Sequence, residues 1–173
     1  MSSLETQHIK LLLIEENSRD LTQLIRGLER FGYQHIDIAR NVAEARAKLD
    51  EKPFDIIVAD MRFGDYSDTV RNSADGFEVL DEVKKRNITS VVIILTANDS
   101  VADSRRAFKE GAWDYISKNM KGNVFEELDK SIRDGMAYFN QRGHDKDSEW
   151  IEDNITQLVA GYEIGRASCR ERV

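Results

Sequence analysis

The sequence has little cysteine, no excess of basic residues and no long apolar run, and each absence excludes a class of protein. Its only cysteine is Cys169, so neither a disulfide framework nor a zinc site is available, and a reducing, cytoplasmic setting is expected. The 173 residues include 25 Lys and Arg against 32 Asp and Glu, a net charge of −7, which argues against nucleic-acid binding by this region alone. The polar N-terminus and the short run IKLLLI predict neither an export signal nor a membrane anchor.

Short apolar runs rich in Val and Ile alternate with amphipathic stretches along most of the chain. The runs predict five strands, at Lys10–Ile14, Ile36–Ala39, Asp55–Ala59, Val91–Thr96 and Trp113–Ile116. They lack strict alternation of apolar and polar residues, so the strands are expected to be buried on both faces. Apolar residues at helical spacing predict helices, most clearly within residues 21–31, 79–83 and 124–136. This order predicts an α/β fold with a doubly wound, five-stranded parallel sheet, because right-handed crossovers place helices on both faces.

Charged and polar side chains gather where the predicted strands end. Glu15 and Glu16 follow the first strand, Asp60 follows the third, Thr96 closes the fourth and Lys118 follows the fifth. The carboxyl ends of parallel strands share one edge of the sheet, where ligands bind. Three carboxylates at one edge favour a divalent cation, and oxygen ligands suit Mg²⁺. An aspartate can also accept a phosphoryl group, whose oxygens an ammonium and a hydroxyl would hold.

Four motifs, LLLIEEN, DIIVAD, VVIILTA and GAWDYISK, resemble those of bacterial response-regulator receiver domains, in the same order, over about residues 9–139. The resemblance implies the flavodoxin-like (βα)5 receiver fold of the CheY-like superfamily. It matches Asp60 to the phosphoacceptor, Thr96 and Lys118 to the residues that hold the phosphoryl group, and Thr96 and Tyr115 to the residues that switch with phosphorylation. The groups that match the Mg²⁺ ligands are Glu15, Glu16, Asp60 and the backbone carbonyl of Met61.

The resemblance also implies a function in two-component signalling. A histidine kinase or a phosphotransfer protein would phosphorylate the domain, which would then switch a partner or an output domain and could form a homodimer. Its role would be signalling rather than enzymatic catalysis, without direct binding to nucleic acid or membrane.

Three features depart from the family pattern. The acidic pair is two glutamates, Asn119 stands where a proline commonly follows the lysine, and the connection from Asp60 to Gly76 is longer than usual. Without that proline, a cis peptide bond is not expected there. The glutamate pair and the missing proline keep one alternative open, a pseudo-receiver that is not phosphorylated and acts as a protein-binding module.

The domain organisation is expected to comprise three parts. Residues 1–141 would form the receiver domain, and residues 142–162 a linker and the start of a helix that leads to a missing downstream region. Residues 163–173, EIGRASCRERV, resemble a translated sequencing adapter and are expected to be a non-native tail.

Overall fold

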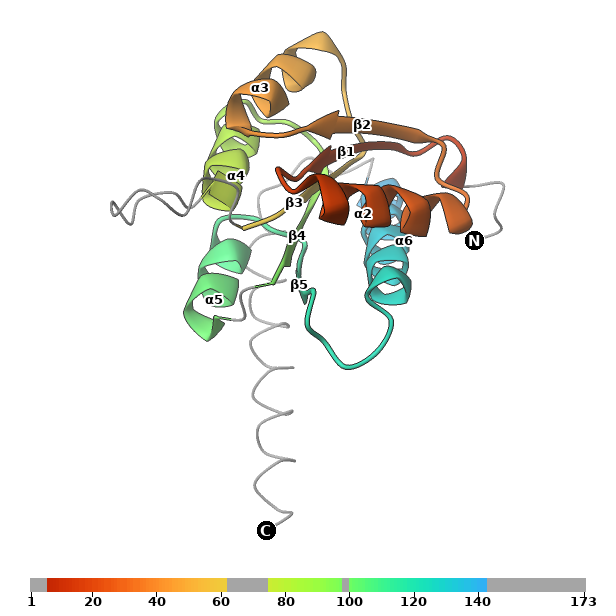
Figure 1. Ribbon diagram of the computed structural model, residues 1–173. Helices are drawn as coiled ribbons and strands as arrows, with labels where there is room; N and C mark the ends of the chain where they lie inside the picture. Colours follow the sequence, from red (N-terminus) through yellow and green to blue (C-terminus); the bar gives the residue numbers. More distant parts are fainter. Residues whose placement is uncertain (1–5, 62–74, 98–99, 143–173) are drawn as a thin grey trace. The chain divides into compact units, whose positions relative to one another are not determined.

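The computed structural model describes residues 6–61, 75–97 and 100–142 and shows one parallel sheet with helices on both faces (Figure 1). The strand order is β2-β1-β3-β4-β5. The strands are β1 (Lys10–Ile14), β2 (His35–Ala39), β3 (Ile56–Ala59), β4 (Val91–Thr96) and β5 (Asp114–Ser117). The predicted fold class is therefore confirmed.

The strand ends agree with the predicted ones to within one residue. β5 begins at Asp114, so Trp113 lies just before the strand rather than in it. The Trp113 backbone N–H still donates to the Val92 carbonyl at 2.7 Å, and its indole N–H donates to the Ser131 carbonyl at 3.1 Å. Trp113 therefore connects the start of β5 by hydrogen bonds to β4 and to residue Ser131 in the segment 124–142.

Five helices follow the strands in turn. They are α2 (Ser18–Arg30), α3 (Val42–Glu51), α4 (Asp75–Lys85), α5 (Val101–Lys109) and α6 (Val124–Arg142). Polar side chains cap several of them at the N-terminus, as expected where the first backbone N–H groups lack helical partners. The Asn17 side chain accepts from two N–H groups of α2, and Ser100 accepts from one of α5.

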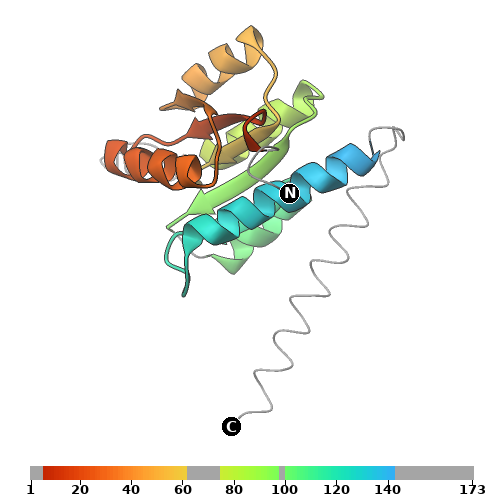
Figure 2. The same ribbon diagram turned by 90° about the vertical axis from the view of Figure 1, so that its right-hand side faces the viewer.

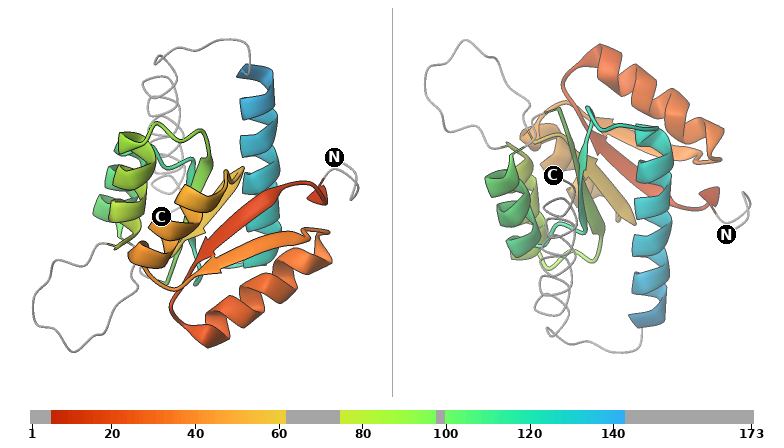
Figure 3. Two further views of the ribbon diagram at one scale, coloured as in Figure 1. Left: turned by 90° about the horizontal axis from the view of Figure 1, so that it is seen from above. Right: turned by 90° about the horizontal axis from the view of Figure 1, so that it is seen from below.

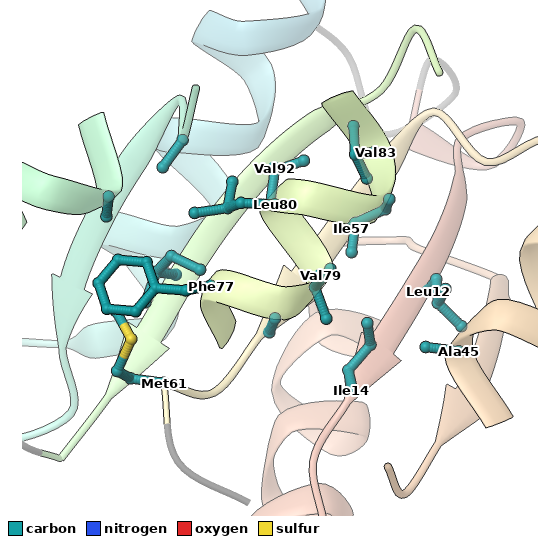
Figure 4. Packing of buried hydrophobic residues seen from close by; sticks show 14 of the residues in the cluster. Leu12, Ile14, Ala45, Ile57, Met61, Phe77, Val79, Leu80, Val83 and Val92 are labelled. Atoms are coloured by element: carbon teal, nitrogen blue, oxygen red, sulfur yellow. The ribbon is translucent and has the colours of Figure 1, made fainter. Parts of the chain in front are cut away.

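Alternate strand residues face two separate apolar layers. Leu12, Ile57 and Val92 face α3, α4 and α5 (Figure 4), whereas their neighbours Leu11 and Ile93 face α2 and α6. Figures 2 and 3 show this arrangement from other directions, with α2 and α6 together on one side of the sheet. Burial on both faces explains why the strands are continuous apolar runs.

The chain divides into two compact units, Met1–Gln141 and Arg142–Val173. Apart from Arg142, the second unit lies outside the described residues, as do the predicted linker, helix and non-native tail. Within the described ranges, no helix combines the length and the apolar character needed to cross a membrane.

Candidate functional site at the carboxyl edge of the sheet

Backbone hydrogen bonds place three predicted site residues one step beyond the strands. The Glu15 N–H donates to the Ala39 carbonyl at 3.0 Å, and the Asp60 N–H donates to the Ile14 carbonyl at 3.0 Å. The Lys118 N–H donates to the Thr96 carbonyl at 2.7 Å. The sheet register therefore brings Glu15, Asp60 and Lys118 to the same edge.

The Lys118 ammonium lies among three carboxylates. Its Nζ is 2.6 Å from Glu15 Oε2, 2.8 Å from Asp60 Oδ2 and 3.0 Å from Asp20 Oδ2. The exposed fraction of the side chain is 15% for Lys118, 5% for Glu15 and 11% for Asp60, against 37% for Asp20. An ammonium has three N–H donors, and each has a carboxylate acceptor here.

Burial and charge act in opposite directions on two groups of the site. Burial by itself would lower the pKa of Lys118, but the hydrogen bonds to Asp60 and Glu15 outweigh burial and raise it. Burial raises the pKa of the Glu15 carboxyl above its ordinary value, although the Lys118 ammonium opposes the shift. Lys118 is therefore held as a cation.

The predicted acidic pair separates into a buried and an exposed residue. Glu15 is buried, and its second carboxylate oxygen, Oε1, accepts the Asn17 N–H at 2.8 Å, whereas the Glu16 side chain is exposed. Of the two glutamates, Glu15 is the one whose carboxylate contacts Lys118.

The chemistry of the donor set fits a hard divalent cation such as Mg²⁺. Glu15, Asp20 and Asp60 together with Lys118 carry a net charge of −2, and carboxylate oxygens are ligands that Mg²⁺ accepts. Among the described residues, however, no group of three His, Cys, Asp or Glu side chains is already arranged to hold a metal ion. The acidic oxygens instead converge on the Lys118 ammonium.

The remaining predicted residues lie around this centre. Thr96 is buried at the end of β4, and its carbonyl accepts the Lys118 N–H. Tyr115 is half-buried and packs against the apolar layer under α3, α4 and α5. The Met61 side chain is buried in the same layer (Figure 4), while its carbonyl accepts the Gly76 N–H at 3.3 Å.

Gly76 brings the start of α4 close to the Asp60 backbone. A Cβ atom on Gly76 would lie 2.9 Å from the Asp60 carbonyl oxygen and 3.0 Å from Met61 Cα. Both neighbours are backbone atoms, which cannot rotate away as the end of a flexible side chain could. The absence of a side chain at residue 76 therefore allows α4 to begin beside Asp60.

Two contacts at the site were not predicted from the sequence. Asp20 reaches Lys118 from the first turn of α2, and the only sequence signal for it is an acidic residue shortly after a strand end. Asn119 donates through Nδ2 to the Ala97 carbonyl at 2.7 Å and so connects the segments that follow β5 and β4. No peptide bond in the described ranges is cis.

Comparisons with known proteins agree with this geometry. The family model for the response regulator receiver domain matches residues 11–131. The transcriptional regulatory protein ZraR of Klebsiella oxytoca is 30% identical over 132 residues, which cover 76% of this chain and 27% of ZraR. The photosynthetic apparatus regulatory protein RegA of Rhodobacter capsulatus is 30% identical over 113 residues, which cover 65% of this chain and 56% of RegA. The chain thus spans only part of each relative.

Solved structures show the same fold. A response regulator receiver domain protein from Clostridium thermocellum superposes with a TM-score of 0.64 at 24% identity, covering 77% of this chain and 98% of that one. The beryllofluoride-activated NtrC4 receiver domain dimer superposes with a TM-score of 0.60 at 28% identity, covering 73% of this chain and 98% of that one.

Proposed function

Because the chain belongs to the response regulator receiver domain family, we propose that it is a phosphorylation-dependent switch in which Asp60 accepts the phosphoryl group. The observation that carries the proposal is the position of Lys118 Nζ, 2.8 Å from the Asp60 carboxylate and 2.6 Å from Glu15. The donor would be the phosphorylated histidine of a histidine kinase or of a phosphotransfer protein. The switched component would be a partner protein or a further domain of a longer chain.

The site residues have distinct tasks in this proposal. An Asp60 carboxylate oxygen attacks phosphorus while the bond from phosphorus to the donor nitrogen breaks, so that an acyl phosphate forms. The Lys118 ammonium neutralises part of the negative charge on the transferring group, and the Thr96 hydroxyl is available to a phosphoryl oxygen. Glu15 and Asp60 would hold Mg²⁺, with Glu16 and the Met61 carbonyl as further candidate ligands. When bound, the metal supplies additional charge neutralisation.

Thr96 and Tyr115 are proposed to transmit the change. Thr96 ends β4, the strand next to β5, and Tyr115 on β5 packs against the apolar layer that contains α5 residue Ala107. The NtrC4 receiver domain was solved as an activated dimer. By that likeness, a homodimer is proposed as one form of the phosphorylated protein.

The proposed role is signalling in the cytoplasm, without an enzymatic activity toward other molecules and without direct binding of this region to nucleic acid or membrane. A pseudo-receiver remains the second candidate, and two observations favour it. The Glu16 side chain is exposed, and all three N–H donors of Lys118 already have carboxylate acceptors. Such a module would bind partners without phosphorylation.

Intact-mass measurement with acetyl phosphate and Mg²⁺ separates the two candidates. The parent protein should gain one phosphoryl group, and chelation of Mg²⁺ or the substitution Asp60→Asn should prevent the gain. Asp81→Asn is a matched control, because Asp81 forms an exposed ion pair with Lys85 on α4, and this variant should be phosphorylated like the parent. Phosphorylation of Asp60→Asn would refute the assignment of Asp60, and absence of phosphorylation in the parent would favour the pseudo-receiver.

A further inference from the structure

Asp20 supplies an additional carboxylate that contacts Lys118, the lysine beside the proposed phosphoacceptor Asp60. Its Oδ2 lies 3.0 Å from Lys118 Nζ, the longest of the three carboxylate contacts, and its side chain is the most exposed of the three acids. Asp20 also comes from a different element, the first turn of α2, whereas Glu15 and Asp60 follow strands. It is therefore the acceptor that the ammonium can exchange most easily.

Local hydrogen bonds fix Asp20 in this position. The Asn17 side chain caps α2 by accepting the N–H groups of Arg19 at 2.9 Å and Asp20 at 3.3 Å. The Asn17 N–H in turn donates to Glu15 Oε1 at 2.8 Å. Glu15, Asn17, Asp20 and Lys118 thus form a closed ring of contacts, in which the side chain of Asp20 is directed to Lys118 by the way α2 begins.

We propose that Asp20 is a positioning residue that competes with the phosphoryl group for the Lys118 ammonium and thereby limits the phosphorylation of Asp60. The inference rests on the proposed function. When Asp60 is phosphorylated, a phosphoryl oxygen needs an N–H from Lys118, but the ammonium has only three and Asp20 holds one of them. Asp20 also adds a negative charge near a group that is itself negative.

The proposed competition predicts in which direction phosphorylation changes when the charge of Asp20 is removed. Without the Asp20 charge, Glu15 and Asp60 still hold the ammonium at 2.6 and 2.8 Å, so Lys118 remains at the site. The N–H that pointed to residue 20 is then held only by a weaker, neutral acceptor and passes more readily to the phosphoryl group, and one like charge is lost from its surroundings. Removing the charge of Asp20 should therefore favour the phosphorylated form.

The test uses Asp20→Asn, which keeps the size of the side chain and removes its charge. At saturating Mg²⁺ and limiting acetyl phosphate, the ratio of phosphorylated to unphosphorylated protein should rise about twofold to fivefold, the factor that corresponds to about 0.5 to 1 kcal/mol for a partly exposed ion pair. Asp20→Glu, which restores the charge, should lower the ratio toward that of the parent. Asp81→Asn should not change the ratio, because it removes the same charge from an exposed pair on α4.

A second measurement does not depend on phosphorylation. Amine acetylation followed by peptide mass spectrometry should show faster labelling of Lys118 in Asp20→Asn, with Lys85 unchanged. In Asp81→Asn, Lys85 should be labelled faster and Lys118 should not.

The outcomes distinguish failure of this inference from failure of the proposed function. If the parent is phosphorylated on Asp60 and Asp20→Asn shows an equal or lower ratio, the competition is refuted and the proposed function stands. If neither protein is phosphorylated, the proposed function fails. Faster Lys118 labelling in Asp20→Asn would still support the ion pair between Asp20 and the Lys118 ammonium. Unchanged Lys118 labelling in Asp20→Asn would refute the ion pair between Asp20 and Lys118 in either case.

Discussion

Replacing Lys118 with alanine should destabilise the protein, because it leaves three carboxylates at the site without their shared cation. Glu15 and Asp60 are largely buried, and each accepts a hydrogen bond from the ammonium that would be lost. Removing one partner of a fully buried ion pair costs about 3 to 5 kcal/mol. Asp20 is partly exposed and Glu15 can take up a proton, so we expect a smaller loss of about 2 kcal/mol in the free energy of unfolding. For a chain of this length, the melting temperature should fall by about 4 to 8 °C.

The pH dependence of this loss follows from Glu15. Its pKa is raised in the folded protein above the ordinary value of 4.5, so the folded state binds more protons than the unfolded state in the range just above that value. Carboxylates without a nearby ammonium have higher pKa values, so this range should extend further in Lys118→Ala. The stability difference between parent and variant should therefore shrink as the pH falls from 7 toward 5.

Divalent cations provide the complementary test. Mg²⁺ draws on the same carboxylates as the ammonium, so it should stabilise Lys118→Ala more than the parent. A ligand at about 100 times its dissociation constant stabilises the folded state by about 2.7 kcal/mol, enough to offset the loss.

Thermal unfolding followed by circular dichroism, with EDTA or Mg²⁺ at pH 5 and 7, measures each of these effects. Lys85→Ala is the control, since Lys85 is paired with Asp81 on the surface and its removal should change the melting temperature little. A melting temperature of Lys118→Ala equal to that of the parent would refute the reasoning. A loss that neither Mg²⁺ nor lower pH reduces would show that the destabilisation arises elsewhere.

Two further predictions concern packing. Ser131→Ala should stabilise the protein by about 1 kcal/mol in urea unfolding, because the hydroxyl of Ser131 is buried on α6 with no hydrogen-bond partner within the described ranges, and alanine favours the helix. Ser90→Ala is the matched control and should destabilise it by about 1 kcal/mol, because the Ser90 hydroxyl donates to the Phe54 carbonyl at 2.6 Å. Gly76→Ala should lower the free energy of unfolding by about 1 to 3 kcal/mol and slow phosphorylation, because its Cβ would contact the Asp60 backbone. Equal stability and equal phosphorylation of Gly76→Ala and the parent would show that α4 shifts without cost.

The sheet could be predicted from the sequence in more detail than the helices could. β1 and β4 have the predicted bounds because each is a continuous apolar run buried on both faces. α3 and α5 were not delimited by apolar spacing, because the fully buried residue of each is a single alanine, Ala45 or Ala107. Short helices with so little buried apolar surface have a weak periodic pattern.

The candidate site was predictable only where the backbone register determines it. Strand ends place Glu15, Asp60 and Lys118 together, and this follows from parallel pairing alone. The contact of Asp20 with Lys118 depends on where α2 begins and joins residues 98 positions apart in the sequence, which no local pattern reveals. The exposure of Glu16 depends on the course of the backbone after β1, which the sequence motif does not reveal.

The hydrogen bond between the Gly76 N–H and the Met61 carbonyl has a consequence for protein engineering. β3 ends at Ala59 and α4 begins at Asp75, and the hydrogen bond between Met61 and Gly76 joins these two elements just after Asp60. A peptide tag or a small reporter domain inserted between them would begin and end at residues that already lie together, and closing a flexible inserted segment costs only about 0.6 kcal/mol for each doubling of its length. Such an insertion replaces no residue of the site.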